Sequence, residues 1–201
     1  MSLSRAVLFL WGCSLTMVSY GQAVEQKHLI ISLGGGGGYS TLISTIDSLH
    51  GKALRSSAIR FAFGYALSEK WSLGGHYDRI GTVVHPGQID RIRYTTYMIE
   101  GTYRPFNKGS DAIETSLGVG VNIAVVRPEE ALIPFRSMSP VLNIGARYLH
   151  LINGTIGLFI SIDHAQGFES ALKKPDGSVT GDPARISWHA QRLNGGMLVR
   201  F

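Results

Sequence analysis

Residues 112–126 read AIETSLGVGVNIAVV, and two kinds of side chain alternate along the whole segment. The odd positions are apolar apart from Thr115, whereas the even positions up to Ala124 are small or polar and include Glu114 and Asn122. A period of two residues sends successive side chains to opposite faces of a β-strand. This segment therefore predicts a strand with one apolar face and one small or polar face.

The alternation recurs along the rest of the chain. Two further segments repeat it cleanly, at residues 58–67 and 155–163. Five others repeat it less regularly, at residues 28–42, 71–84, 91–105, 140–152 and 186–201. Turn-forming residues separate the segments, and no convincing amphipathic helix is found from His28 onward. The sequence predicts an all-β domain of eight antiparallel strands.

The composition excludes two other classes of protein. Charged residues make up only 16% of the 201 residues, which include 25 glycines. Disordered chains carry high charge and few aromatics, whereas this chain is 9% aromatic. Helical membrane proteins need runs of about 20 apolar residues, and only the extreme N-terminus approaches one. The formal net charge of +5 gives little support to a nucleic-acid partner, so none is expected.

Residues 1–23 have the features of an export signal. Arg5 precedes an apolar stretch, and small residues stand before a cleavage point after Ala23. Cleavage there leaves residues 24–201 as a single domain without cysteine, because the chain's one cysteine is Cys13. A lipoprotein signal acylated at that cysteine is the alternative, although a bulky Trp stands where a small residue is usual. We expect an exported chain that holds no intrachain disulfide.

The connections favour a membrane barrel over a soluble sandwich. With the N-terminus in the periplasm, the odd-numbered connections point out of the cell, and they include the longest ones, at residues 43–56, 127–139 and 168–184. Outer-membrane barrels combine long external loops with short periplasmic turns. The apolar faces are therefore expected to meet lipid, with an aromatic girdle near the periplasmic strand ends. The girdle residues are Tyr65, Trp71, Tyr103, Tyr148 and Phe201.

Two stretches resemble a known family. Residues 65–74 read YALSEKWSLG, and the chain ends in Val199, Arg200 and Phe201. Both are similar to stretches in small bacterial outer-membrane β-barrels of the OmpA-transmembrane, OmpX and OmpW kind, particularly the "outer membrane protein β-barrel domain" proteins common in Bacteroidetes. The resemblance implies an eight-stranded up-and-down transmembrane barrel in the outer membrane of a Gram-negative bacterium, in contact with lipid and lipopolysaccharide. It also implies a sorting signal at Val199 and Phe201, presented to the barrel-insertion machinery.

The polar strand faces carry ionisable side chains that are expected to lie in the lumen. An eight-stranded barrel is just wide enough to be filled by side chains, so charges inside it must find partners. The favoured interpretation is a salt-bridged plug in a protein with a structural or interaction role. The alternative is a narrow pore for small solutes, with these charges setting its selectivity. The predicted lumen network is Arg60, His76, Asp78, Glu100, Arg104, Glu114, Arg147, Asp163, Arg192 and Arg200.

A weaker hypothesis gives the barrel an enzymatic role. If residues 168–184 form the last external connection, His164 faces His189 near the outer rim on the lipid side, with Ser187 two residues away. Outer-membrane lipid A deacylases use a His/Ser pair in such a position. Their motif has His two residues before Ser, however, and the order here is the reverse. No lipid-facing carboxylate is identified to orient the imidazole.

No cofactor or metal is expected. The glycine run at residues 34–38 invites a phosphate-loop interpretation, but no Gly-Lys-Ser/Thr and no helix follow it. A strand where two backbones approach closely, or a bend, explains the run instead. The seven histidines are scattered without the spacing of metal ligands. The external loops carry charges of both signs and no recognisable receptor motif, so an extracellular ligand would be of unknown kind.

Overall fold

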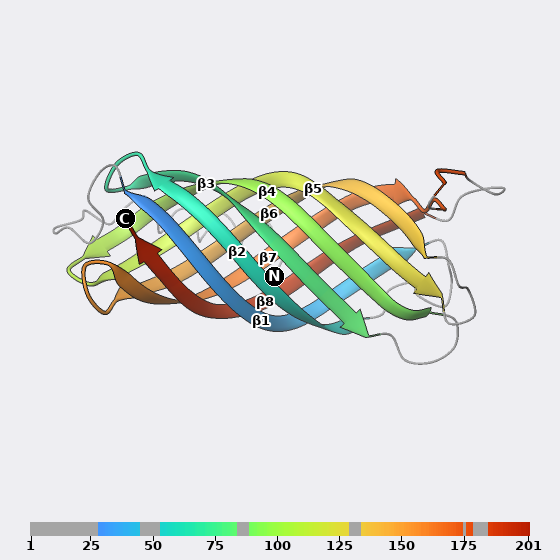
Figure 1. Ribbon diagram of the computed structural model, residues 1–201, viewed down its shortest axis with the longest axis horizontal. Coiled ribbons are helices and arrows are strands. Elements are labelled where there is room, and N and C mark those ends of the chain that lie inside the picture. Colours follow the sequence, from blue (N-terminus) through green and yellow to red (C-terminus); the bar gives the residue numbers. More distant parts are fainter. Residues whose placement is uncertain (1–27, 45–52, 84–88, 129–133, 175, 179–184) are drawn as a thin grey trace, which may run out of the picture.

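The computed structural model describes residues 28–44, 53–83, 89–128, 134–174, 176–178 and 185–201. In them, eight antiparallel strands form a closed barrel in which each strand pairs with its sequence neighbours and β1 pairs with β8 (Figure 1). The strands are β1 (Leu29–Ser44), β2 (Ala53–Ala66), β3 (Trp71–Val83), β4 (Ile89–Lys108), β5 (Asp111–Pro128), β6 (Phe135–Leu151), β7 (Ile156–Ala171) and β8 (Arg185–Arg200). The predicted eight-stranded up-and-down fold is confirmed. The predicted export signal, residues 1–23, lies outside the described residues.

The two ends of the barrel differ in their connections (Figure 1). One edge holds the start of β1, the end of β8 and the short turns that follow β2, β4 and β6, and we call it the terminal end. At the opposite edge, the loop end, β1, β3, β5 and β7 end and β2, β4, β6 and β8 begin. The longer connections therefore gather at one edge, as the sequence predicts.

Several strands are longer than the hydropathy pattern predicts. β4 runs to Lys108 rather than to residue 105, so its turn to β5 comprises only Gly109 and Ser110. Gly109 has a φ of 61°, in the left-handed region that glycine enters without a Cβ clash. β7 reaches Ala171, beyond the expected limit at residue 163. Backbone pairing continues where the side-chain alternation fades, because ladder hydrogen bonds join main-chain groups.

The outward face of the barrel is apolar. Large side chains that a soluble protein would bury are exposed on every strand, with Ile99 at 65% and Phe63 at 55%. Near the terminal end, the rings of Trp71 and Tyr103 lie 4.7 Å apart on neighbouring strands. An exposed apolar surface of this kind is how a barrel meets lipid. No helix in the described residues is long and apolar enough to cross a membrane.

The inward face is not polar throughout, and this corrects the expected division into an apolar outside and a polar lumen. A buried apolar cluster, the loop-end cluster, fills the barrel toward the loop end. A smaller one, which includes Leu149, Phe159 and Leu198, lies near the terminal end. Large members of the loop-end cluster include Trp188, Tyr94, Leu42, Ile80 and Ile92. Inward apolar residues near strand ends explain why these strands show less regular alternation in the sequence.

The glycine run of β1 marks a close approach between two strands. Gly34 to Gly38 pair with residues 196 to 192 of β8, where the barrel closes. A Cβ on Gly36 would collide with the carbonyl oxygen of Leu193, and one on Gly38 with that of Gln191. Because the run lies inside a strand, it forms no phosphate loop, and the close-approach interpretation holds.

Candidate functional site

Buried charges occupy the middle of the barrel and extend toward the terminal end. At their centre, Arg60 on β2 donates from Nε to Asp78 Oδ1 at 2.7 Å and from Nη2 to Asp78 Oδ2 at 2.9 Å. Arg192 on β8 reaches the same carboxylate from across the barrel, with Nη1 2.7 Å from Asp78 Oδ2. Paired hydrogen bonds between a planar guanidinium and a carboxylate are short and directional. They fix Asp78 between two arginines, one from the neighbouring strand β2 and one from β8.

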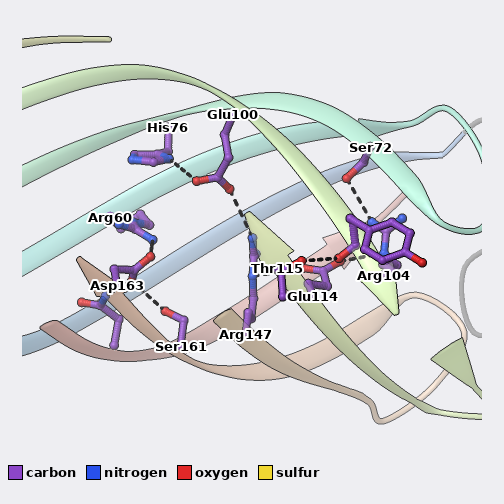
Figure 2. A network of polar contacts seen from close by, with 12 residues as sticks. Arg60, Ser72, His76, Glu100, Arg104, Glu114, Thr115, Arg147, Ser161 and Asp163 are labelled. Atoms are coloured by element: carbon purple, nitrogen blue, oxygen red, sulfur yellow. Dashed lines mark hydrogen bonds and ion pairs between the residues drawn. The ribbon is translucent and has the colours of Figure 1, made fainter. Parts of the chain in front are cut away.

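Asp163 on β7 is the second acceptor for Arg60. Its Oδ1 lies 2.9 Å from Arg60 Nη1 (Figure 2). One guanidinium therefore joins carboxylates from β3 and β7. The other oxygen accepts from Asn194 Nδ2 at 2.7 Å and from Ser161 Oγ at 3.1 Å. Neutral donors therefore complete the hydrogen bonding of this buried carboxylate, as a charge taken out of water requires.

His76 connects this centre to a second group of charges. Its Nε2 lies 3.4 Å from Asp78 Oδ2, and its Nδ1 lies 3.2 Å from Glu100 Oε2. Glu100 in turn lies 3.7 Å from Arg147, measured from Oε1 to Nη2 (Figure 2). The imidazole is almost fully buried between two carboxylates from β3 and β4. It is the link through which the network runs along the barrel axis.

The second group is built on Glu114 of β5. Arg147 Nε lies 3.1 Å from Glu114 Oε2, and Arg104 donates from Nε to Glu114 Oε1 at 2.7 Å. Arg104 also donates from Nη2 to Ser72 Oγ at 3.2 Å (Figure 2). The Arg147 guanidinium lies 5.4 Å from the centre of the Phe159 ring, within the range of a cation–π contact. Phe159 occupies space left by Gly34 and Gly196, so those glycines accommodate a ring rather than a charge.

Nine of the ten predicted lumen residues form this chain of contacts. Four arginines stand against four carboxylates, with His76 between two of them. Such a balance matters because an unpaired charge in a low-dielectric interior is very costly. Arg200 lies elsewhere, at the last position of β8, where its backbone N–H donates to the Thr155 carbonyl at 2.7 Å.

A small cavity borders the second group of charges. Its volume is about 40 Å³, and Glu100, Arg104, Glu114 and Arg147 contribute to its lining. That is room for a few water molecules, since one water occupies at least roughly 10–15 Å³ measured in this way. Within the described residues, no group of His, Cys, Asp and Glu side chains is arranged to hold a metal ion.

The loop-end cluster lies over the charged centre and was missed by the sequence reasoning. Its core is the stacked pair Tyr94 and Trp188, whose ring centres are 4.8 Å apart at an interplanar angle of 29°. Both side chains are almost completely buried. The indole packs over Gly167 of β7, where a Cβ would clash with it. The sequence did contain a signal for this cluster. Assigning Ser187 and His189 to the outer face places Trp188, which lies between them, on the inward face.

The candidate enzymatic residues do not meet as expected. His164 lies opposite Gln191, and His189 lies opposite Gln166, so the expected pairing of the two histidines is wrong. The expected pairing assumed that β7 and β8 are joined by residues 168–184. In the structure β7 extends to Ala171 and its pairing with β8 is irregular after Gly167, so the midpoint of the connection lies further along the chain. His164, Ser187 and His189 all lie on the outward face. No hydrogen bond among the described residues joins them to one another or to a carboxylate.

Comparisons with known proteins agree on the fold. No protein-family model and no curated protein matches the chain. Neisserial surface protein A is similar over 87% of this chain and 97% of its own, with a TM-score of 0.61 at 13% identity. Outer membrane protein OprG from Pseudomonas aeruginosa matches over 90% and 98%, with a TM-score of 0.57 at 12% identity. Outer membrane protein AlkL matches over 92% and 93%, with a TM-score of 0.51 at 12% identity.

The barrel fold, the outward apolar surface and these neighbours give one consistent assignment. The chain folds as a small eight-stranded β-barrel of the kind found in these outer-membrane proteins, with an apolar outward face. Sequence identities this low show a shared fold only. The role of this barrel therefore has to be inferred from its own residues.

Proposed function

We propose that this protein is a closed outer-membrane barrel with a structural or interaction role, which anchors external segments and conducts no solutes through its interior. The observation that carries the proposal is the filled lumen. The ion-paired layer joins β2, β3, β7 and β8 across the barrel through Arg60, Asp78, Asp163 and Arg192. A solute would have to separate these pairs to pass.

Two further features support a closed interior. The loop-end cluster covers the charged layer with fully buried apolar side chains, among them Trp188, Tyr94 and Ile80. The cavity on the other side holds only about 40 Å³. A path for hydrated solutes needs a continuous polar route, whereas here an apolar layer and an ion-paired layer lie in series. Binding by such a protein is then a property of its outer surface and its loops.

Conductance in planar lipid bilayers tests the proposal. The folded mature protein should produce no stepwise current, and Trp188→Ala should remain silent because the ion-paired layer is still present. Stepwise currents from the wild-type protein that change in size with Glu100→Gln or Arg147→Gln would contradict the proposal, since they would place the conducting path through the charged layer. The outward variant Trp71→Ala is the matched control for Trp188→Ala.

A further inference from the structure

The outward face changes from apolar to basic toward the loop end on one side of the barrel. On β3, Trp71, Leu73 and Tyr77 are followed by Arg79, which is exposed. On β5, the outward apolar run ends at Arg127, which is exposed as well. Arg93 on β4 and Arg136 on β6 hold similar outward positions nearer the loop end than the apolar part of their strands. Four neighbouring strands therefore each present a cation just past the apolar surface.

The strand register places these cations side by side. Arg79 lies opposite Thr95, two residues from Arg93, so the two arginines are diagonal neighbours on one face. Val125 lies opposite both Arg93 and Arg136, which makes Arg127 a diagonal neighbour of each. Diagonal neighbours are about 7–8 Å apart, within reach of long side chains.

A fifth cation extends the group. Lys173 lies opposite Arg136, and the two backbones exchange hydrogen bonds of 2.8 Å in each direction. Both side chains are exposed. Like charges placed directly opposite each other destabilise a strand pair. We call the group formed by Arg79, Arg93, Arg127, Arg136 and Lys173 the basic seam.

Nothing in the described part of the chain neutralises the basic seam. The exposed ion pairs that the structure shows are Asp111 with His150 and Glu169 with Arg185, and neither includes a seam residue. The buried carboxylates are already paired inside the barrel. Among the described side chains, the seam is thus a patch of adjacent positive charge that pairs with no carboxylate. The other side of the rim differs, because β7 and β8 present His164, Gln166, His189 and Gln191 at their outward positions.

We propose that the basic seam binds the phosphate groups of a phosphorylated glycolipid in the outer leaflet. The seam borders an apolar surface, so one ligand can satisfy both: acyl chains pack on the apolar strands while phosphates meet the guanidinium groups. Arginine suits this role, because its planar fork donates two parallel hydrogen bonds to a phosphate. A free phosphate would use only the exposed cations, where water and salt screen the attraction. The proposal therefore commits to a lipid.

Binding of a bisphosphorylated lipid A tests the proposal. The folded mature protein in detergent micelles is mixed with this lipid, and native mass spectrometry measures the fraction of barrels that retain it. The seam variant carries Arg93→Gln, Arg127→Gln and Arg136→Gln. The control variant carries Arg55→Gln, Lys70→Gln and Lys108→Gln, which removes the same charge from exposed positions outside the seam. Heat-modifiable migration on a gel confirms that every variant is folded.

We expect the seam variant to bind the lipid about a hundredfold more weakly, because each Lys or Arg at an anionic lipid surface contributes about a factor of five. The control variant should bind like the wild-type protein, and a dephosphorylated lipid should bind both equally weakly. Equal retention by the wild-type protein and the seam variant overturns the proposal. So does an equal loss in both variants, which would show an effect of net charge alone. Displacement of the lipid by equimolar inorganic phosphate also overturns it, because the site would then be one for soluble anions.

Discussion

Replacing Asp78 with Asn should destabilise the barrel strongly while changing almost nothing in shape. Asp78 is the shared acceptor of Arg60 and Arg192, and its side chain is about 1% exposed. After the change Arg60 keeps Asp163, whereas Arg192 keeps only a 3.5 Å contact with the amide oxygen of Asn143. The expected loss in the free energy of unfolding is therefore that of one broken buried ion pair. It amounts to about 3–5 kcal/mol, because a buried charge is left without its partner.

Urea unfolding of the refolded protein in micelles measures this cost, with the gel shift of the folded band as the probe. Glu169→Gln is the matched control, because it makes the same carboxylate-to-amide change in a pair whose side chains are both 59% exposed. The control should lose no more than about 1 kcal/mol. The double variant Asp78→Asn with Arg192→Gln should be less destabilised than the sum of the single changes, since it removes both partners together. If Asp78→Asn is as stable as Glu169→Gln, the buried ion pairs do not stabilise the folded barrel.

Two further changes test the closure and the insertion of the barrel. Gly36→Val should prevent β1 from pairing fully with β8, because even a Cβ there collides with the Leu193 carbonyl, and the folded gel band should be largely lost. Gly35→Val should retain that band, because its side chain points outward and its Cβ meets only the Ala58 carbonyl oxygen at 3.5 Å. If Val199 and Phe201 form the sorting signal, deletion of Phe201 should slow insertion into the outer membrane. Membrane fractionation after a pulse of expression measures the rate at which the protein accumulates there. An unchanged rate would rule out this sorting signal.

Most of the charged layer could be predicted from the sequence because a β-strand has a strict period. Alternation along each strand separates an apolar face from a small or polar one. Assigning the polar face to the lumen places Glu114, Arg147 and Asp163 inside the barrel. The pairing among them could not be predicted, because it depends on which strands lie across the barrel from one another. Arg60 meets Asp163 from 103 positions away in the sequence and Arg192 meets Asp78 from 114, distances that only barrel closure bridges.

The register between β7 and β8 was the second feature that could not be predicted from the sequence. The connection between β7 and β8 has no diagnostic turn motif, so its centre could not be fixed, and a small shift moved His164 from His189 to Gln191. In contrast, residues 152–155 connect β6 to β7 in a turn that one side chain explains. Asn153 Oδ1 accepts from the backbone N–H groups of Thr155 and Ile156 at 2.9 and 2.7 Å. A local hydrogen bond can be foreseen from local sequence, whereas a long connection carries no such information.

The sequence by itself determined the class of fold, the strand number and the sorting of side chains between lipid and lumen, because each follows from a two-residue period read along single strands. The tertiary structure decided how the lumen is filled. It brought inward apolar residues from separate strands together as the loop-end cluster, and it joined four arginines and four carboxylates into one network. It also aligned the outward cations of four strands into the basic seam. Neighbours across a barrel are set by register and closure, and neither is a property of one segment.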